Sequence, residues 1–211
     1  MKAYVSLRTG TLSDLRERIP RLEAWGLTGV MVGDHLFIQA PGQPRGEARR
    51  PLEPMTVLAT VATLSDRLHI GTMVSNLSFL HPALVLRQFA QLAALFGGER
   101  VLAGLELSVE RVRSASAAAG RPGTAVSMSV LVGWLEFCRA SEVAGVAEWI
   151  CRDNRLPPQS LDDCPYALLG EPAQMVDTLQ QRRDRFGLDM VIIAGSIDPQ
   201  RFCEEVLPHV S

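Results

Sequence analysis

Residues 51–105 read PLEPMTVLATVATLSDRLHIGTMVSNLSFLHPALVLRQFAQLAALFGGERVLAGL. Apolar residues at helical spacing predict helices over residues 54–64 and 82–96, and each begins at a proline, which suits the first turn of a helix. Apolar runs without alternation predict buried strands over residues 68–74 and 100–105. We therefore expect this stretch to form two helix–strand units.

The same alternation continues on both sides of this stretch. The other expected strands are residues 3–7, 29–32, 126–132 and 190–194, and the other expected helices begin at Thr11 or span 109–119, 142–153, 172–186 and 199–207. Buried strands joined by helices are typical of a parallel sheet. No G-x-G-x-x-G follows the first strand, which disfavours a dinucleotide-binding fold. We expect a single domain over residues 1–211, with an α/β, TIM-barrel-like fold that lacks about two of the eight strands.

The composition excludes several classes of protein. Of 211 residues, 47% are hydrophobic and 21% charged, and the net charge of -2 gives no attraction to nucleic acid or a membrane surface. The four cysteines form no C-x-x-C pair, so neither a metal site nor a disulfide framework is expected. The N-terminal residues lack an apolar signal core, and no apolar run is long enough to span a membrane. We expect a cytoplasmic protein.

Three stretches together resemble the bacterial luciferase-like superfamily of flavin- and deazaflavin-dependent oxidoreductases. They are GVMVGDHLF at residues 29–37, the stretch 51–105, and LLGEPAQMVDTLQQRRDRFGLDMVIIAG at residues 168–195. The resemblance implies reduced FMN or the deazaflavin coenzyme as cofactor and a small organic molecule as substrate. It also implies a homodimer that pairs through helices near the second and third strands, and a sheet with missing strands has edges that need covering.

The chain departs from this family after the fourth expected strand. The family has a glycine-rich stretch there, followed by a fifth and a sixth strand, and these segments supply much of the cofactor's phosphate site. Glu106 and Leu107 stand where the glycines would be, and the two strands are expected to be deleted. A glycine lets the backbone approach a ligand closely, whereas the Glu106 carboxylate would repel a phosphate.

Asp34 and His35 directly follow the second expected strand. The carboxyl ends of barrel strands carry active sites, and histidine titrates near neutral pH, so His35 is a candidate proton donor or acceptor. The resemblance places His35 at the cofactor face, with Asp34 orienting it. The alternative is an Asp–His pair that only closes the strand end through hydrogen bonds.

Two further groups of residues are candidates for binding the cofactor. Met73, Val74, Ser75 and Asn76 match the end of the family's third strand, where a bulge, often with a non-proline cis peptide, supports the cofactor ring. The alternative is a plain strand end followed by a polar turn. Gly195 and Ser196 follow the last expected strand and form a possible anion nest. The arginines of the loop after the second strand are a possible clamp for a carboxylate or a cofactor tail; they are Arg45, Arg49 and Arg50.

Three functions are compatible with these residues. The first is a shortened luciferase-like oxidoreductase or monooxygenase, in which the cofactor carries the redox chemistry. The second is a degenerate, cofactor-free member that binds a hydrophobic small molecule or catalyses a rearrangement or cyclisation with His35 and Glu106. The third is a non-catalytic accessory subunit. Family membership favours the first, which we take as the leading hypothesis.

Overall fold

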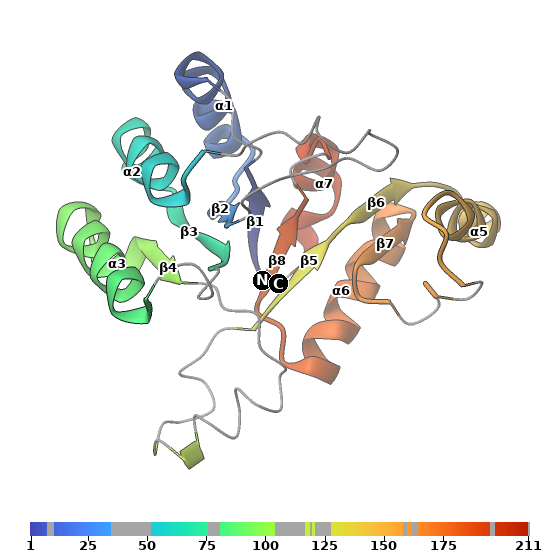
Figure 1. Ribbon diagram of the computed structural model, residues 1–211. Helices are drawn as coiled ribbons and strands as arrows, with labels where there is room; N and C mark the ends of the chain where they lie inside the picture. The colour runs from blue at the N-terminus through green and yellow to red at the C-terminus, as the bar shows by residue number, and fades with distance from the viewer. Residues whose placement is uncertain are drawn as a thin grey trace. The chain divides into compact units, whose positions relative to one another are not determined.

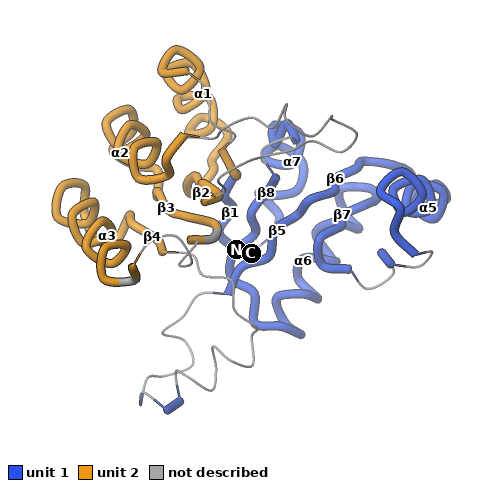
Figure 2. Tube along the Cα trace, in the orientation of Figure 1, with its two compact units in different colours: residues 1–5, 108–211 blue, residues 6–107 orange. Residues whose placement is uncertain are grey.

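The computed structural model describes residues 1–7, 11–34, 52–75, 81–103, 117–118, 120, 128–157, 160–161, 164–194 and 197–210. The chain divides into two compact units (Figure 2). Unit 1 consists of Met1–Val5 and Ser108–Ser211, and unit 2 is Ser6–Leu107. Each unit is described by itself below.

Unit 2 contains three parallel strands and three helices. The strands are β2 (Gly29–Gly33), β3 (His69–Val74) and β4 (Val101–Ala103), and the helices are α1 (Leu12–Ala24), α2 (Pro54–Leu64) and α3 (Pro82–Phe96). β3 lies between β2 and β4, and Ile70 pairs with Val30 on one side and Val101 on the other. In Figure 1 the three helices lie in a row along one side of these strands.

Side chains at the helix starts explain where the helices of unit 2 begin. The Thr11 hydroxyl accepts a hydrogen bond from the Asp14 N–H at 3.2 Å, and the Asp14 carboxylate accepts one from the Thr11 N–H at 2.7 Å. This capping box satisfies two backbone groups at the start of α1. At the starts of α2 and α3, the side chains of Glu53 and His81 each accept one backbone hydrogen bond, from the N–H of Thr56 and Ala83 respectively. Pro20 lies inside α1 at an exposed position, and the helix continues through it to Ala24.

Arg100 links the chain segments at the amino-terminal ends of β3 and β4. It ends the short 3-10 helix η1 (Gly98–Arg100), and its guanidinium donates to the carbonyl oxygens of Ser65 at 2.5 Å, Leu68 at 3.0 Å and Phe96 at 3.3 Å. Ser65 also binds the Glu23 carboxylate at 2.5 Å, which links α1 to the turn before β3. One arginine therefore connects the end of α3 to the α2–β3 turn.

Unit 1 contains a second set of three parallel strands. They are β1 (Lys2–Ser6), β8 (Met190–Ile193) and β5 (Ser129–Val132). β8 lies between the other two, and Met190 pairs with both Lys2 and Ser129. All four residues of β8 are buried, as the apolar run in the sequence predicts.

A separate two-stranded parallel sheet was not predicted from the sequence. It pairs β6 (Trp134–Phe137) with β7 (Ala167–Gly170). Only Gly133 separates β5 from β6, so one continuous stretch of chain pairs first with β8 and then with β7. Among the described residues of unit 1, the helical segments whose bounds are defined are η3 (Ala140–Glu142), α5 (Val143–Asp153), α6 (Pro172–Phe186), α7 (Gln200–Glu205) and η4 (Leu207–His209).

The small sheet is stabilised by a local core and by one arginine. Ile150 and Cys151 of α5 pack with Leu161 and Ala167 in a buried cluster. Arg182 of α6 donates to the carbonyl oxygens of three residues at or before the start of β7. These are Cys164 and Pro165, at 3.1 Å each, and Ala167, at 2.7 Å. Within the described residues, no helix is long and apolar enough to cross a membrane.

Candidate functional site

The carboxyl-terminal ends of β2 and β3 form the candidate site in unit 2. The two strands are parallel and paired, so their ends lie at the same edge. The register places Val32 opposite Thr72 and Gly33 opposite Val74, which leaves Met73 as an extra residue in β3. We call this one-residue register shift the bulge, and β-bulges frequently occur beside active sites because they redirect the chain.

The structure brings four of the predicted site residues to this edge. Met73 and Val74 end β3, Ser75 follows them, and Asp34 follows Gly33, the partner of Val74. Met73 and Asp34 are partly exposed, whereas Ser75 is buried. Asp34 and Ser75 are therefore each one residue beyond the last pair of the two strands. No peptide bond in the described residues is cis.

The other predicted site residues lie outside the described residues. They are His35, Asn76, Glu106, Gly195 and Ser196. Arg45, Arg49 and Arg50 also lie outside them.

Thr72 is a further residue at this edge, and it was not predicted from the sequence as a site residue. Its Oγ1 atom lies 2.8 Å from Ser75 Oγ, and the two residues are only 1% and 8% exposed. A hydrogen bond between two buried hydroxyls is strengthened by the low dielectric around it. The signal in the sequence is a Thr and a Ser three residues apart at the end of a strand, and its meaning depends on the bulge between them.

The carboxyl-terminal edge of β6 and β7 in unit 1 is acidic. Glu171 precedes α6 and forms a capping box with Gln174, whose Oε1 accepts from the Glu171 N–H at 3.0 Å. The pKa of the Cys138 thiol is raised, first by burial and then by the nearby carboxylates of Glu142, Glu136 and Glu171, although a hydrogen bond with the Gly170 backbone opposes the shift. Such an edge disfavours an anionic ligand such as a phosphate.

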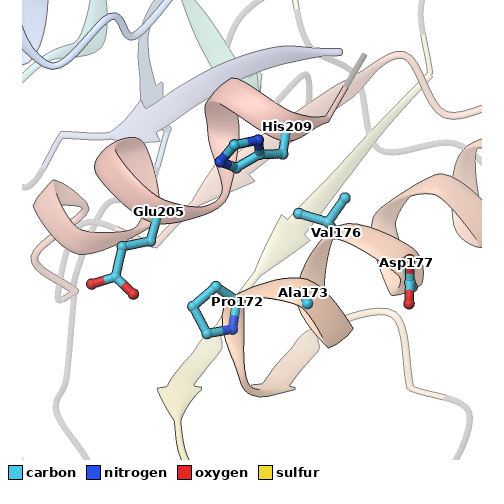
Figure 3. Close-up of a pocket in the computed structure, with 6 residues that line it drawn as sticks. All are labelled: Pro172, Ala173, Val176, Asp177, Glu205 and His209. Atoms are coloured by element: carbon cyan, nitrogen blue, oxygen red, sulfur yellow. The ribbon is translucent and has the colours of Figure 1, made fainter.

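A hollow of about 370 Å³ lies between α6 and the α7–η4 segment. It is lined by Pro172, Ala173, Val176, Asp177, Glu205 and His209 (Figure 3). Glu205 is paired with Arg201 at 2.8 Å, and Asp177 and Glu205 lie at opposite ends of the hollow. Its charged groups therefore do not converge on one point. Across the described ranges, no three His, Cys, Asp or Glu side chains are grouped so as to hold a metal ion.

Comparison with known proteins finds a family similar to the segment of the chain that contains the bulge. Residues 3–105 match the family model of luciferase-like monooxygenases. The resemblance stated from the sequence is confirmed. No curated protein matches the chain.

Several solved structures are similar over the whole chain. The coenzyme F420 dependent tetrahydromethanopterin reductase from Methanopyrus kandleri has a TM-score of 0.64 and 10% identity, over 100% of this chain and 99% of that chain. An F420-dependent secondary alcohol dehydrogenase has a TM-score of 0.69 and 12% identity, with the same coverage. Monooxygenase RslO1 from Streptomyces bottropensis has a TM-score of 0.64 and 16% identity, over 100% of both chains. These identities establish the fold alone, and the predicted incomplete, TIM-barrel-like α/β fold is confirmed.

Each unit has features that bear on a different part of a flavin or deazaflavin. The bulge at Met73 supplies an irregular strand end of the kind that can support a planar ring. The acidic edge near Glu171 does not suit a phosphate. The side chains of Arg100 and Arg182 donate hydrogen bonds to backbone carbonyl oxygens instead of contributing to a binding site. A ring-binding site is therefore supported more directly than a phosphate site.

Proposed function

We propose that this chain is a luciferase-like oxidoreductase that uses reduced FMN or the deazaflavin coenzyme on a small organic substrate. The observation that carries the proposal is the bulge at Met73, which lies at the end of β3 inside the luciferase-like half of the chain. Two of the similar structures are named as F420-dependent and one as a monooxygenase, which supports this class of chemistry.

Each site residue has a defined part in the proposed reaction. The bound cofactor supplies the reducing electrons. Met73, Val74 and Ser75 support the ring from the end of β3, and Asn76 extends this support. His35 exchanges a proton with the substrate, and Asp34 holds the imidazole in the required orientation.

Visible absorption and cofactor titration test this function. We expect the purified protein to carry a chromophore or to bind FMN or the deazaflavin coenzyme at micromolar concentration. Ser75→Ala and His35→Ala should weaken binding or turnover. The matched control is Ser13→Ala, because Ser13 is an exposed residue of α1. If neither cofactor binds at millimolar concentration, the oxidoreductase proposal is refuted.

The acidic edge of β6 and β7 favours a second candidate function. A cofactor-free member would need no phosphate site. The carboxylates of Glu136, Glu142 and Glu171 would then not weaken the binding of its ligand. His35 and Glu106 would act as acid and base in a non-redox rearrangement or cyclisation. If this function is correct, the wild type converts an apolar substrate without added cofactor, and Glu106→Gln loses this activity. A third possibility, the accessory subunit, requires a catalytic partner chain.

We also propose that the chain forms a homodimer through the outer faces of α2 and α3. α2 has no charged residue, and α3 has only Arg87, whereas six of the 13 residues of α1 are charged. Leu84, Leu86 and Leu95 of α3 are 50%, 67% and 74% exposed. A two-fold interface brings the same patch of both copies together, so an uncharged patch avoids repulsion between like charges.

Light scattering on eluted protein tests the dimer. We expect Leu86→Glu to convert the dimer to a monomer, because it buries two carboxylates in an apolar contact. Leu12→Glu is the matched control, since Leu12 is an exposed leucine of the charged helix α1. A wild-type monomer, or a Leu86→Glu variant that remains dimeric, would show that the interface lies elsewhere.

The four cysteines are unpaired thiols, which is consistent with the proposed cytoplasmic setting.

A further inference from the structure

We propose that Thr72 is a positioning residue, whose buried hydroxyl holds Ser75 and so keeps the bulge at the end of β3 in the shape that the cofactor ring requires. This inference rests on the proposed function. It assigns to Thr72 a task that differs from ordinary strand packing. It also explains why two hydroxyls are buried at this strand end.

Thr72 is the last residue of β3 that is paired on both sides. It is opposite Val32 of β2 and opposite Ala103 of β4. Its backbone is therefore held by two neighbouring strands. Ser75 comes after the final pair, Gly33 with Val74, and has no strand partner in either register.

The hydroxyl contact joins these two unequal positions. The 2.8 Å distance between Thr72 Oγ1 and Ser75 Oγ spans the extra residue, Met73. A bulge leaves the added residue outside the ladder, so its shape is less constrained than that of a regular strand. A side-chain bond from a doubly paired residue to the residue beyond the strand removes much of that freedom.

The burial of the pair makes the bond effective. Thr72 is 1% exposed and Ser75 is 8% exposed, so water does not compete readily for either hydroxyl. Removal of one hydroxyl leaves the other buried group without this partner, which carries a larger penalty than the loss of an exposed bond. We therefore expect the strand end to adopt another conformation when Thr72 loses its hydroxyl.

The consequence for binding follows from the shape of the ligand. A flavin or deazaflavin presents a planar, heteroaromatic ring with carbonyl oxygens at its edge, and such a ring needs backbone and hydroxyl groups at defined positions. Met73 is partly exposed and Ser75 is buried. These two residues present one defined surface to the cofactor ring only if the backbone between them is held in place. Rigid support of this kind lowers the entropic cost of binding.

The test compares three variants. Thr72→Val removes the hydroxyl and keeps the side-chain shape, whereas Thr72→Ser keeps a hydroxyl. Thr178→Val is the matched control, because Thr178 is a partly buried threonine of α6 in unit 1. For each protein we would measure the dissociation constants of FMN and the deazaflavin coenzyme, the absorption band of the bound cofactor and the midpoint of thermal unfolding.

We expect Thr72→Val to bind the cofactor about five- to tenfold more weakly, which corresponds to the loss of one buried hydrogen bond, and to shift the absorption band. Thr72→Ser should remain within about twofold of the wild type, and Thr178→Val should be unchanged. If Thr72→Val lowers the unfolding midpoint but leaves the affinity and the band as in the wild type, Thr72 is merely structural and the proposal is wrong.

Two further outcomes are decisive. If Thr72→Val does not fold, Ser75→Ala removes the other half of the same bond and must show the same loss of affinity and the same band shift; normal binding by Ser75→Ala overturns the proposal. If the wild type binds neither cofactor, the proposed function fails and this inference fails with it. If the wild type binds the cofactor and both Thr72→Val and Ser75→Ala bind it as tightly as the wild type, the inference alone is refuted.

Discussion

Replacement of Arg100 by methionine is expected to destabilise unit 2 strongly. The guanidinium donates to the carbonyl oxygens of Ser65, Leu68 and Phe96, and Ser65 and Leu68 are buried residues. Methionine retains much of the aliphatic side chain but provides no donor. Two buried acceptors would then lose their partner, while the Phe96 carbonyl at the end of α3 would turn to water.

The size of the effect follows from these contacts. An unsatisfied buried acceptor costs about 1–3 kcal/mol, so two of them, with partial relaxation, give a loss of about 2–4 kcal/mol in the free energy of unfolding. Urea denaturation followed by circular dichroism measures this loss as a lower midpoint at an unchanged slope. Arg100→Lys keeps one donor group and should lose about half as much, because an ammonium cannot reach three carbonyls in the manner of a planar guanidinium.

Arg16→Met is the control for the loss of a charged side chain. Arg16 is an exposed residue of α1, and surface substitutions of this kind usually change stability by less than about 0.5 kcal/mol. If Arg100→Met is no less stable than Arg16→Met, the three carbonyl contacts do not hold this part of unit 2 together, and the reasoning is refuted.

Three other predictions concern unit 1. Arg182→Met should lower stability by about 2–3 kcal/mol in the same urea assay, because the carbonyls at the start of β7 lose a shared donor. Burial, with a smaller effect of Asp189, raises the pKa of the Tyr4 hydroxyl to about 12. The contribution of this hydroxyl to stability is therefore complete below pH 10 and is lost as the pH rises from 10 to 12. Tyr4→Phe should remove this part of the pH dependence of the thermal unfolding midpoint. Burial raises the pKa of the Cys203 thiol to about 12, so a thiol reagent at pH 8 should modify Cys203 in the native protein far more slowly than in urea; equal rates in both would contradict its burial.

The sequence predicted the helices and the strands of unit 2 well because each is determined locally. α2 and α3 begin at prolines and carry apolar residues at helical spacing, and both begin and end where this pattern does. β6 and β7 were missed, although β4, β5 and β8 are no longer and were predicted. Their pairing joins Trp134 to Ala167, which are far apart in the sequence, so no local pattern reveals it.

The candidate site was predictable in location but not in geometry. The resemblance placed Met73, Val74 and Ser75 at the end of a strand, and the structure places them there. The contact between Thr72 and Ser75 depends on the extra residue in β3, and this extra residue is defined only by the register with β2. Registers are long-range properties of a sheet, so the hydroxyl pair could not be derived from the spacing of a Thr and a Ser alone.

The electrostatics of the described residues lead to a final prediction about the cofactor, which rests on the proposed function. In unit 2, Arg100 is engaged by carbonyl oxygens, Arg21 is paired with Glu17, and Arg67 is paired with Glu23. A phosphate would therefore gain little from these groups, while the ring would still be supported by the end of β3.

We accordingly expect FMN to bind no more than about threefold more tightly than riboflavin, which has the same ring and no phosphate; threefold corresponds to less than about 1 kcal/mol. Parallel fluorescence titrations at low and high salt measure this difference. A preference for FMN of tenfold or more that decreases with salt would contradict the argument, because it would require cations that contact the phosphate. Arg45, Arg49 and Arg50 would then be the residues to replace with glutamine, and the ring-binding role of the β3 end would be unaffected.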